Sequence, residues 1–192
     1  MFALTHPLVL ASQSPRRRQI LEMLGFDFTV QAADTDETPP LGMEAERVPE
    51  FLALKKALEI SRLRPEALVL GSDTLVELDG EILGKPVDAA DAVAMLSRLH
   101  GRTHRVFTGV ALARGGERLG SSTGRSEVTF ASWNLSDLEA YVQGGEPMDK
   151  AGAYAVQGRG AFLVEKIDGC FFNVMGLPIQ KTLHLLAPSR AT

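Results

Sequence analysis

The sequence predicts one α/β domain in which helices flank a mixed β-sheet, with the α+β character that tight hairpins confer. Short apolar runs typical of buried strands alternate with amphipathic segments typical of helices. Asp79-Gly80 lies between two apolar segments and is the strongest hairpin signal, and a hairpin makes neighbouring strands antiparallel. The 192 residues contain no repeat, low-complexity tract or linker. We therefore expect a single domain over residues 1–192, with a mixed sheet and not a doubly wound parallel one.

Composition narrows the class of protein. Twenty basic residues face 24 acidic ones, giving a formal net charge of −4, which argues against a nucleic-acid partner bound along the whole chain. The one cysteine, Cys170, permits no intrachain disulfide and fits a reducing compartment. No apolar run approaches the ~18 residues of a membrane span, and no basic segment suggests a signal peptide. We expect a cytoplasmic protein without a membrane partner.

The N-terminal half predicts a strand, a polar loop and a helix in that order. Residues 8–11 are a short apolar run typical of a buried strand. Ser14 is a favourable N-cap, Pro15 suits the first helical position and Gly25 is a natural stop, so a helix is expected between them. The further elements expected here are strands over 26–31, 67–71, 75–78 and 81–83, an acidic loop over 34–40 and a helix over 49–63.

The C-terminal half predicts more antiparallel pairing. A long hairpin turning at Gly115-Gly116 is expected to join strands over 105–113 and 125–131. Ser136 and Glu139 have the spacing of a capping box, which opens a helix. The remaining expected elements are a helix over 89–99, strands over 153–156 and 161–167, and a terminal helix opened by 176–178 and running through Leu186.

Arg16, Arg17 and Arg18 place three cations in the first turn of a predicted helix. The helix dipole already makes that end positive, so the arrangement is unfavourable until an anion completes it. Phosphate suits both the unpaired N–H groups of the helix and bidentate guanidinium groups. The preceding loop also lies at the carboxyl end of a strand, where α/β proteins place their sites. The alternative is a solvated basic face.

Carboxylates and lysines extend this candidate site. Asp73 is expected at the end of a buried strand, where a carboxylate must be paired or coordinated. Asp36 and Glu37 lie in the acidic loop, and hard oxygen ligands of this kind hold Mg²⁺ on a polyphosphate. Lys56 and Lys85 supply further positive charge. Each also has a simpler interpretation, as a capping aspartate, loop acid or solvated lysine. The histidines and Cys170 show no ligand spacing, and no P-loop is present.

Together these residues form an ordered set of motifs. The motifs are Leu10-Ala11-Ser12-Gln13-Ser14-Pro15-Arg16-Arg17, Asp36-Glu37-Thr38, Lys56-Ala57, Gly71-Ser72-Asp73-Thr74, Gly84-Lys85-Pro86, Asp149-Lys150-Ala151-Gly152-Ala153-Tyr154, Gln157-Gly158 and Gly176-Leu177-Pro178. Each motif alone is weak, but their order over about residues 8–186 resembles the Maf family. That family comprises nucleoside triphosphate pyrophosphatases once described as septum-formation inhibitors.

The resemblance implies a fold like that of inosine triphosphate pyrophosphatase, with two lobes around a cleft. It implies metal-dependent hydrolysis, with Mg²⁺ or Mn²⁺, of a nucleoside triphosphate to the monophosphate and pyrophosphate. Further family-based expectations are the removal of unwanted nucleotides from the cellular pools, a link to cell-division arrest and a homodimer. The residues implied are Asp73 as proton acceptor, Arg16, Thr74 and Gln157 for base specificity, Ser12, Arg17, Lys56 and Lys85 for substrate binding, and Glu37 with Asp73 for the metal.

Arg16, Thr74 and Gln157 resemble the specificity residues of the branch that acts on dTTP and UTP. The carboxamide of Gln157 offers a donor and an acceptor, which match the O4 and N3–H edge of uracil or thymine. A second branch, which acts on 7-methyl-GTP, has tryptophan, glutamine and glutamate at these positions. One alternative is therefore a pyrophosphatase for modified nucleotides such as 7-methyl-GTP. Another alternative, from a different functional class, is a non-enzymatic regulator of septum formation.

Overall fold

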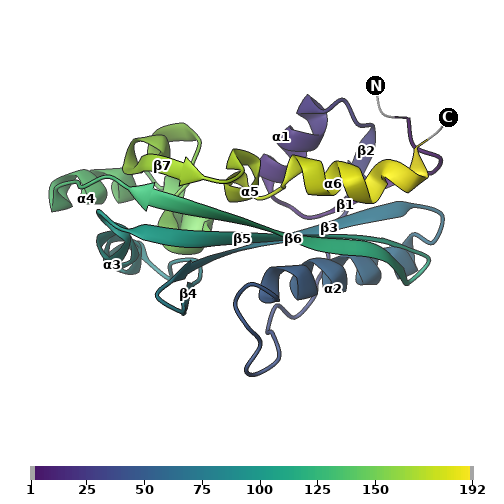
Figure 1. The fold of residues 1–192 in the computed structure, drawn as a ribbon, viewed down its shortest axis with the longest axis horizontal. Helices are drawn as coiled ribbons and strands as arrows, with labels where there is room; N and C mark the ends of the chain where they lie inside the picture. Colours follow the sequence, from purple (N-terminus) through teal and green to yellow (C-terminus); the bar gives the residue numbers. More distant parts are fainter. Residues whose placement is uncertain (1–2, 191–192) are drawn as a thin grey trace.

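A computed structural model describes residues 3–190 and shows a seven-stranded mixed sheet (Figure 1). Six strands run in the order β2-β1-β3-β5-β6-β7, and β4 pairs with β3 outside this path. The strands are β1 (Leu8–Ala11), β2 (Phe28–Val30), β3 (Leu68–Leu78), β4 (Glu81–Leu83), β5 (Thr103–Arg114), β6 (Glu117–Phe130) and β7 (Val164–Asp168). β1 is parallel to β2 and β3, whereas the other pairs are antiparallel. The mixed sheet expected from the hairpin signals is confirmed.

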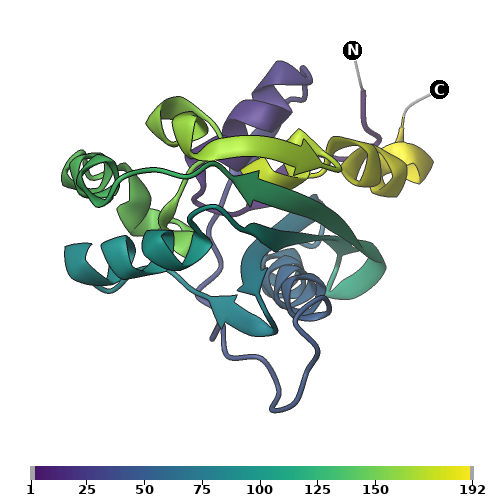
Figure 2. The same ribbon diagram turned by 60° about the vertical axis from the view of Figure 1, so that its left-hand side comes forward.

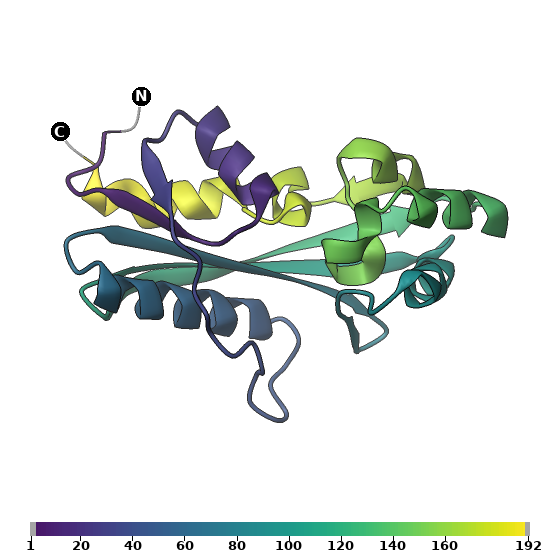
Figure 3. The ribbon, with the colours of Figure 1, turned by 180° about the vertical axis from the view of Figure 1, so that it is seen from behind.

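Helices cover both faces of this sheet. The helices are α1 (Pro15–Met23), α2 (Val48–Leu63), α3 (Ala89–Leu99), α4 (Leu135–Gln143), α5 (Phe171–Met175) and α6 (Ile179–Leu186). α2 lies against one face, and α1, α5 and α6 lie against the other (Figures 1 and 3). α3 and α4 lie at the far end of the long strands β3, β5 and β6 (Figures 1 and 2). Among residues 3–190, no helix combines the length and apolar character needed to span a bilayer.

The long strands join two lobes that have separate cores. In the first lobe, β1, α1, α2 and α6 pack on one half of β3 and β5, with Leu10, Leu70 and Leu112 almost fully buried. In the second lobe, α3, α4 and the segment 151–163 pack on the other half, around Phe130 and Leu163. The chain ends of the described region meet at the first lobe, where the backbone N–H of Thr5 donates to Ser189 O (2.9 Å).

Two glycines allow α2 to lie directly on the sheet. A Cβ atom on Gly71 of β3 would be 2.1 Å from the carbonyl oxygen of Ala53, and one on Gly109 of β5 would be 2.2 Å from the carbonyl carbon of Pro49. Both neighbours are helix backbone, which cannot move aside as a flexible side chain does. The contact therefore fixes the height of α2, and with it Lys56, above β3.

Two local predictions are wrong, and a third is correct in position only. Residues 153–156 form no strand, because a 3-10 turn (Ala151–Ala153) and an irregular segment replace it, so β6 pairs with β5 and β7 but not with this segment. The capping box forms two residues earlier than expected, with the backbone N–H of Asn134 donating to Asp137 (3.3 Å). Ser14 precedes α1 as expected, but its side chain caps no N–H group.

Candidate active site

The sheet has an open edge at Asp73 and Thr74. β1 pairs with β3 only as far as Gly71, and β4 pairs with β3 only from Val76 onward. Residues 72–75 therefore have a strand neighbour on the β5 side alone. Successive side chains of a strand point to opposite faces, so Asp73 faces the α2 side and Thr74 the α1 side.

The prediction that Asp73 ends a strand is wrong, because β3 continues for five residues beyond it. The polar residues interrupt the hydrophobic pattern but not the backbone pairing with β5. The site is instead where a neighbouring strand, β1, stops. Asp73 therefore lies beside the carboxyl end of β1, which runs parallel to β3, and α/β proteins place their sites at such strand ends.

A cavity of about 750 Å³ opens at this edge between the two lobes. All nine site residues predicted from the sequence line it: Ser12, Arg16, Arg17, Glu37, Lys56, Asp73, Thr74, Lys85 and Gln157. The expected cleft between two lobes is therefore present.

On the α2 side, Lys56 joins two carboxylates. Its ammonium group lies 2.6 Å from Asp73 Oδ1 and 2.7 Å from Glu37 Oε1. Burial alone would raise the pKa of Glu37, but the hydrogen bond and charge of Lys56, with Lys85 and Arg17 further away, hold that pKa below its usual value. Asp36 takes no part, because it accepts from the backbone N–H of Thr38 (2.9 Å) and does not line the cavity.

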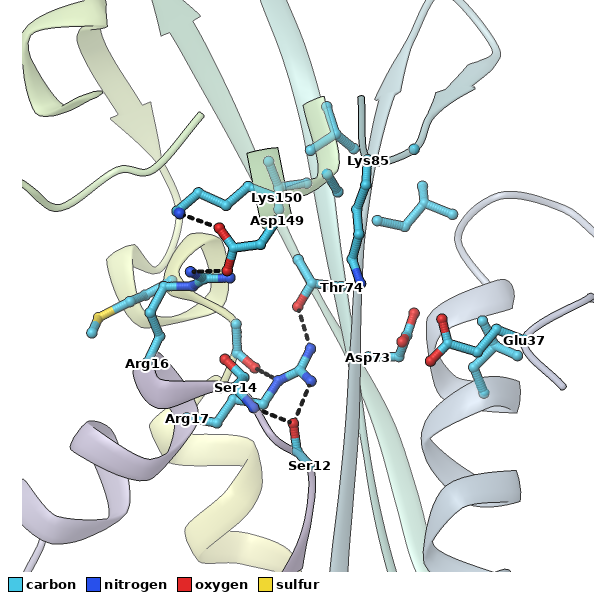
Figure 4. A pocket seen from close by; sticks show the side chains of 18 of the residues that line it. Ser12, Ser14, Arg16, Arg17, Glu37, Asp73, Thr74, Lys85, Asp149 and Lys150 are labelled. Carbon is cyan, nitrogen blue, oxygen red and sulfur yellow. Dashed lines mark hydrogen bonds and ion pairs between the residues drawn. The ribbon is translucent and has the colours of Figure 1, made fainter. Parts of the chain in front are cut away.

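On the α1 side, Arg17 organises the loop after β1. Its guanidinium donates to Ser12 Oγ (2.9 Å), Thr74 Oγ1 (3.2 Å) and the carbonyl oxygen of Gly176 (2.9 Å), as Figure 4 shows in part. Ser72, which is fully buried, also donates to the Gly176 carbonyl oxygen (3.0 Å). Arg17 thus ties α1, β1, β3 and the turn after α5 together at one point. Sequence reasoning gave Gly176 no role beyond opening a helix.

Asp149 bridges the two lobes and received no role from the sequence. It pairs with Arg16 of α1 (3.4 Å) and with the neighbouring Lys150 (Figure 4). Burial opposes its charge, but Lys150 and then Arg16 hold the pKa of Asp149 below its usual value. The motif Asp149-Lys150 was the available signal, since it already stood out in the ordered set.

Lys85 and Gln157 reach the cavity from the second lobe. Lys85 follows β4 and extends its amine towards the space beside Asp73 and Thr74 (Figure 4). Gln157 begins a turn, and its Oε1 atom is buried without a hydrogen-bond partner within the described part of the chain. Buried acceptors are normally hydrogen-bonded, so this unpartnered oxygen stands out among the residues that line the cavity.

The donor set fits a divalent cation bound together with a phosphate ligand. Within residues 3–190, no group of three or more His, Cys, Asp or Glu side chains forms a self-sufficient metal site. Asp73 and Glu37 nevertheless converge on one cation, the ammonium of Lys56. Mg²⁺ takes one or two protein carboxylates and completes its coordination with phosphate and water oxygens.

Sequence comparison assigns the family. The model of the Maf-like protein family matches residues 7–189. The chain belongs to the Maf-like family. A dTTP/UTP pyrophosphatase of Myxococcus xanthus is 51% identical over 179 residues, which cover 93% of this chain and 90% of that protein. A dTTP/UTP pyrophosphatase of Symbiobacterium thermophilum is 48% identical over 179 residues, covering 93% and 92% of the two chains.

Structural comparison extends the likeness of fold beyond the Maf-like family. The Ham1 protein of Staphylococcus aureus superposes with a TM-score of 0.50 at 14% identity, over 95% of this chain and 93% of that one. The mixed sheet with flanking helices is therefore an architecture that the two proteins share. At this identity the likeness concerns the fold alone.

Proposed function

We propose that this Maf-like protein hydrolyses dTTP and UTP to the nucleoside monophosphate and pyrophosphate. The observation that carries the proposal is the convergence of four basic side chains and two carboxylates on one cavity. The cations are Arg16, Arg17, Lys56 and Lys85, and the carboxylates are Glu37 and Asp73. A triphosphate needs such positive charge, and relatives at 48–51% identity carry the name dTTP/UTP pyrophosphatase.

The cavity divides the work between its walls. Phosphoryl transfer depends mainly on positioning and on neutralising charge. Arg17, held rigidly by three hydrogen bonds, presents a fixed positive charge to the triphosphate, and Lys85 approaches from the opposite lobe. Asp73 orients a water molecule and accepts its proton as the oxygen attacks the α-phosphorus, and the bond from that phosphorus to the bridging oxygen of pyrophosphate breaks.

Glu37 and Asp73 are the residues proposed to hold Mg²⁺ or Mn²⁺. Such a cation would add charge neutralisation on the phosphate oxygens. Lys56 donates to both carboxylates and so keeps them directed at the same place. A cytoplasmic location, a homodimer and a role in clearing nucleotide pools accompany the proposal as family-based expectations.

A product assay tests the reaction. Purified protein is incubated with Mg²⁺ and each nucleoside triphosphate in turn, and nucleotide products are separated by chromatography. Phosphate is measured before and after treatment with inorganic pyrophosphatase. We expect dTMP and UMP, with phosphate appearing only after that treatment. Nucleoside diphosphate with immediate phosphate release would overturn the proposed bond cleavage, and absence of hydrolysis with every nucleotide would overturn the enzyme proposal.

A further inference from the structure

Glu146 holds the turn that carries Gln157. One carboxylate oxygen accepts from the backbone N–H of Arg159 (3.1 Å) and the other accepts from that of Gly160 (2.8 Å). The Tyr141 hydroxyl accepts from the backbone N–H of Ala155 (3.2 Å). Gln157 therefore sits between two anchored stretches of backbone.

Two glycines show how closely this turn fits its anchors. Gly158 has a positive φ of 78°, and a Cβ there would be 2.3 Å from Glu146 Oε1. A Cβ on Gly160 would be 2.6 Å from the Tyr141 hydroxyl and 2.4 Å from the carbonyl oxygen of Ala155. Side chains at either position would push the turn off the carboxylate and the hydroxyl. The backbone path on both sides of Gln157 is thus matched to Glu146 and Tyr141.

Glu146 belongs to the support and not to the cavity wall. Gln157 lines the cavity, whereas Glu146 is absent from the described residues that line it. Because a side chain moves with its backbone, the place of the Gln157 carboxamide depends on where the neighbouring backbone is held. A carboxylate that accepts two N–H groups is acceptor-only and suits two donors, whereas an amide is not acceptor-only.

We propose that Glu146 is a positioning residue for base selection, acting through Gln157. By binding the N–H groups of Arg159 and Gly160, it fixes the place from which the Gln157 carboxamide meets the base. The inference rests on the proposed function, and it assigns to that site a determinant of base selectivity outside the cavity. A turn without this anchor lets the amide shift and reverse, so that cytosine is accepted nearly as well as uracil.

The Glu146→Gln variant tests the inference at nearly constant size. Its amide group has one acceptor oxygen, so one backbone N–H then faces the NH₂ group, donor against donor. We expect the ratio of kcat/KM for UTP over CTP to fall at least ~5-fold, which corresponds to the loss of one buried hydrogen-bond match. The change should lie mainly in KM for UTP, with kcat close to wild type. The matched control is Glu165→Gln, which changes an exposed residue of β7 and should keep the wild-type ratio.

A double variant separates positioning from general damage. In a Gln157→Ala background, Glu146→Gln should change the UTP/CTP ratio no further, because the side chain through which it acts is gone. A further fall there, or a wild-type ratio in Glu146→Gln alone, would overturn the inference. Should Glu146→Gln not fold, Glu146→Asp, which withdraws the carboxylate from the N–H groups of Arg159 and Gly160 by one methylene, is expected to lower the same ratio, and a wild-type ratio in it would overturn the inference. Absence of UTP hydrolysis by the wild type would instead defeat the proposed function.

Discussion

The ammonium group of Lys56 lies 2.6 Å from Asp73 Oδ1, and the two side chains are only 11% and 15% exposed. Lys56 comes from α2, which lies directly on β3 through Gly71. The pair therefore depends on a helix–sheet contact that leaves no room for a side chain. In this way the packing of the first lobe sets the orientation of the carboxylate proposed as the base.

Asp73→Asn should lose at least ~100-fold in kcat while remaining folded. The amide keeps the size of the side chain and an acceptor for Lys56, but it cannot take a proton from water. Steady-state hydrolysis of dTTP measures the loss, and circular dichroism with a melting curve checks the fold. Asp27→Asn, an exposed acid in the first lobe, is the control and keeps wild-type turnover. Turnover near wild type in Asp73→Asn would remove Asp73 from the mechanism.

Gly71→Ala tests whether α2 positions the site. The added methyl group would lie 2.1 Å from the backbone oxygen of Ala53, so the helix must move. We expect the free energy of unfolding to fall by about 1–3 kcal/mol, as for overpacked cores, with a parallel loss of turnover as Lys56 leaves Asp73. Urea unfolding measures the first effect. Gly84→Ala, whose methyl group meets nothing within 4 Å, should keep wild-type stability. Equal stability of the two variants would contradict the close contact.

Lys85→Ala should weaken hydrolysis of every nucleotide alike. Lys85 is exposed at the cavity mouth and approaches the site from the second lobe, where it attracts the triphosphate and not the base. Because salt screens such attraction, kcat/KM of the wild type should fall with rising ionic strength, and the variant should show a shallower fall. Rates for UTP, dTTP and CTP over a salt series provide the measurement. A defect confined to one base would mean that Lys85 reads the base.

The elements with strong local signals are predictable from the sequence. β1, α1 and the hairpin at Asp79-Gly80 follow from apolar runs, a proline at the start of a helix and a turn dipeptide, all of which act within a few residues. The segment 153–156 differs from its predicted strand because its apolar residues are buried while their backbone is irregular. Apolar patterning reports burial, and burial does not require a strand.

The site was predictable in its members but not in its arrangement. The ordered motifs contain all nine predicted residues, and all nine line one cavity. The roles of Asp149 and Glu146 could not be read from the sequence, since each acts on a residue 11 or more positions away. The open edge at Asp73 likewise depends on where β1 stops against β3, which is a property of strand register.

His104 should make stability depend on pH between about 6.5 and 4. Burial lowers the pKa of His104 to about 4, so the folded state holds the neutral ring while the unfolded chain binds a proton near pH 6.5. The contribution of His104 to the free energy of unfolding is therefore fully present above the pKa of the unfolded state. It is lost as the pH falls towards the pKa of the folded state, by roughly 2 kcal/mol between pH 7 and pH 5. The measurement is urea unfolding at both pH values. His104→Phe cannot titrate and should lose that much less over the same interval, and identical losses would exclude His104 as the source.

Base selection is the prediction that distinguishes the enzymatic alternatives. The carboxamide of Gln157 has both a donor and an acceptor, and Gln157, Arg16 and Thr74 line the same cavity. Uracil and thymine match the carboxamide, whereas cytosine reverses the order of donor and acceptor along that edge. A buried polar group left unpaired costs about 1–3 kcal/mol, or roughly 5- to 150-fold in rate. We therefore expect dTTP and UTP to be hydrolysed better than CTP and the purine triphosphates by that factor.

Gln157→Glu should depress turnover of dTTP and UTP more than turnover of 7-methyl-GTP. A carboxylate accepts hydrogen bonds but donates none, so it loses the match to O4 of the pyrimidine. The same charge favours a cationic base rich in donors, such as 7-methylguanine. Parallel kcat/KM measurements on the three nucleotides decide the matter, with Asp73→Asn as the inactive reference. Equal losses on all three would show that Gln157 does not read the base. A wild-type preference for 7-methyl-GTP over dTTP would place the protein in the other branch. The proposed pyrophosphatase reaction would still stand, because it depends on the phosphate side of the cavity and not on Gln157.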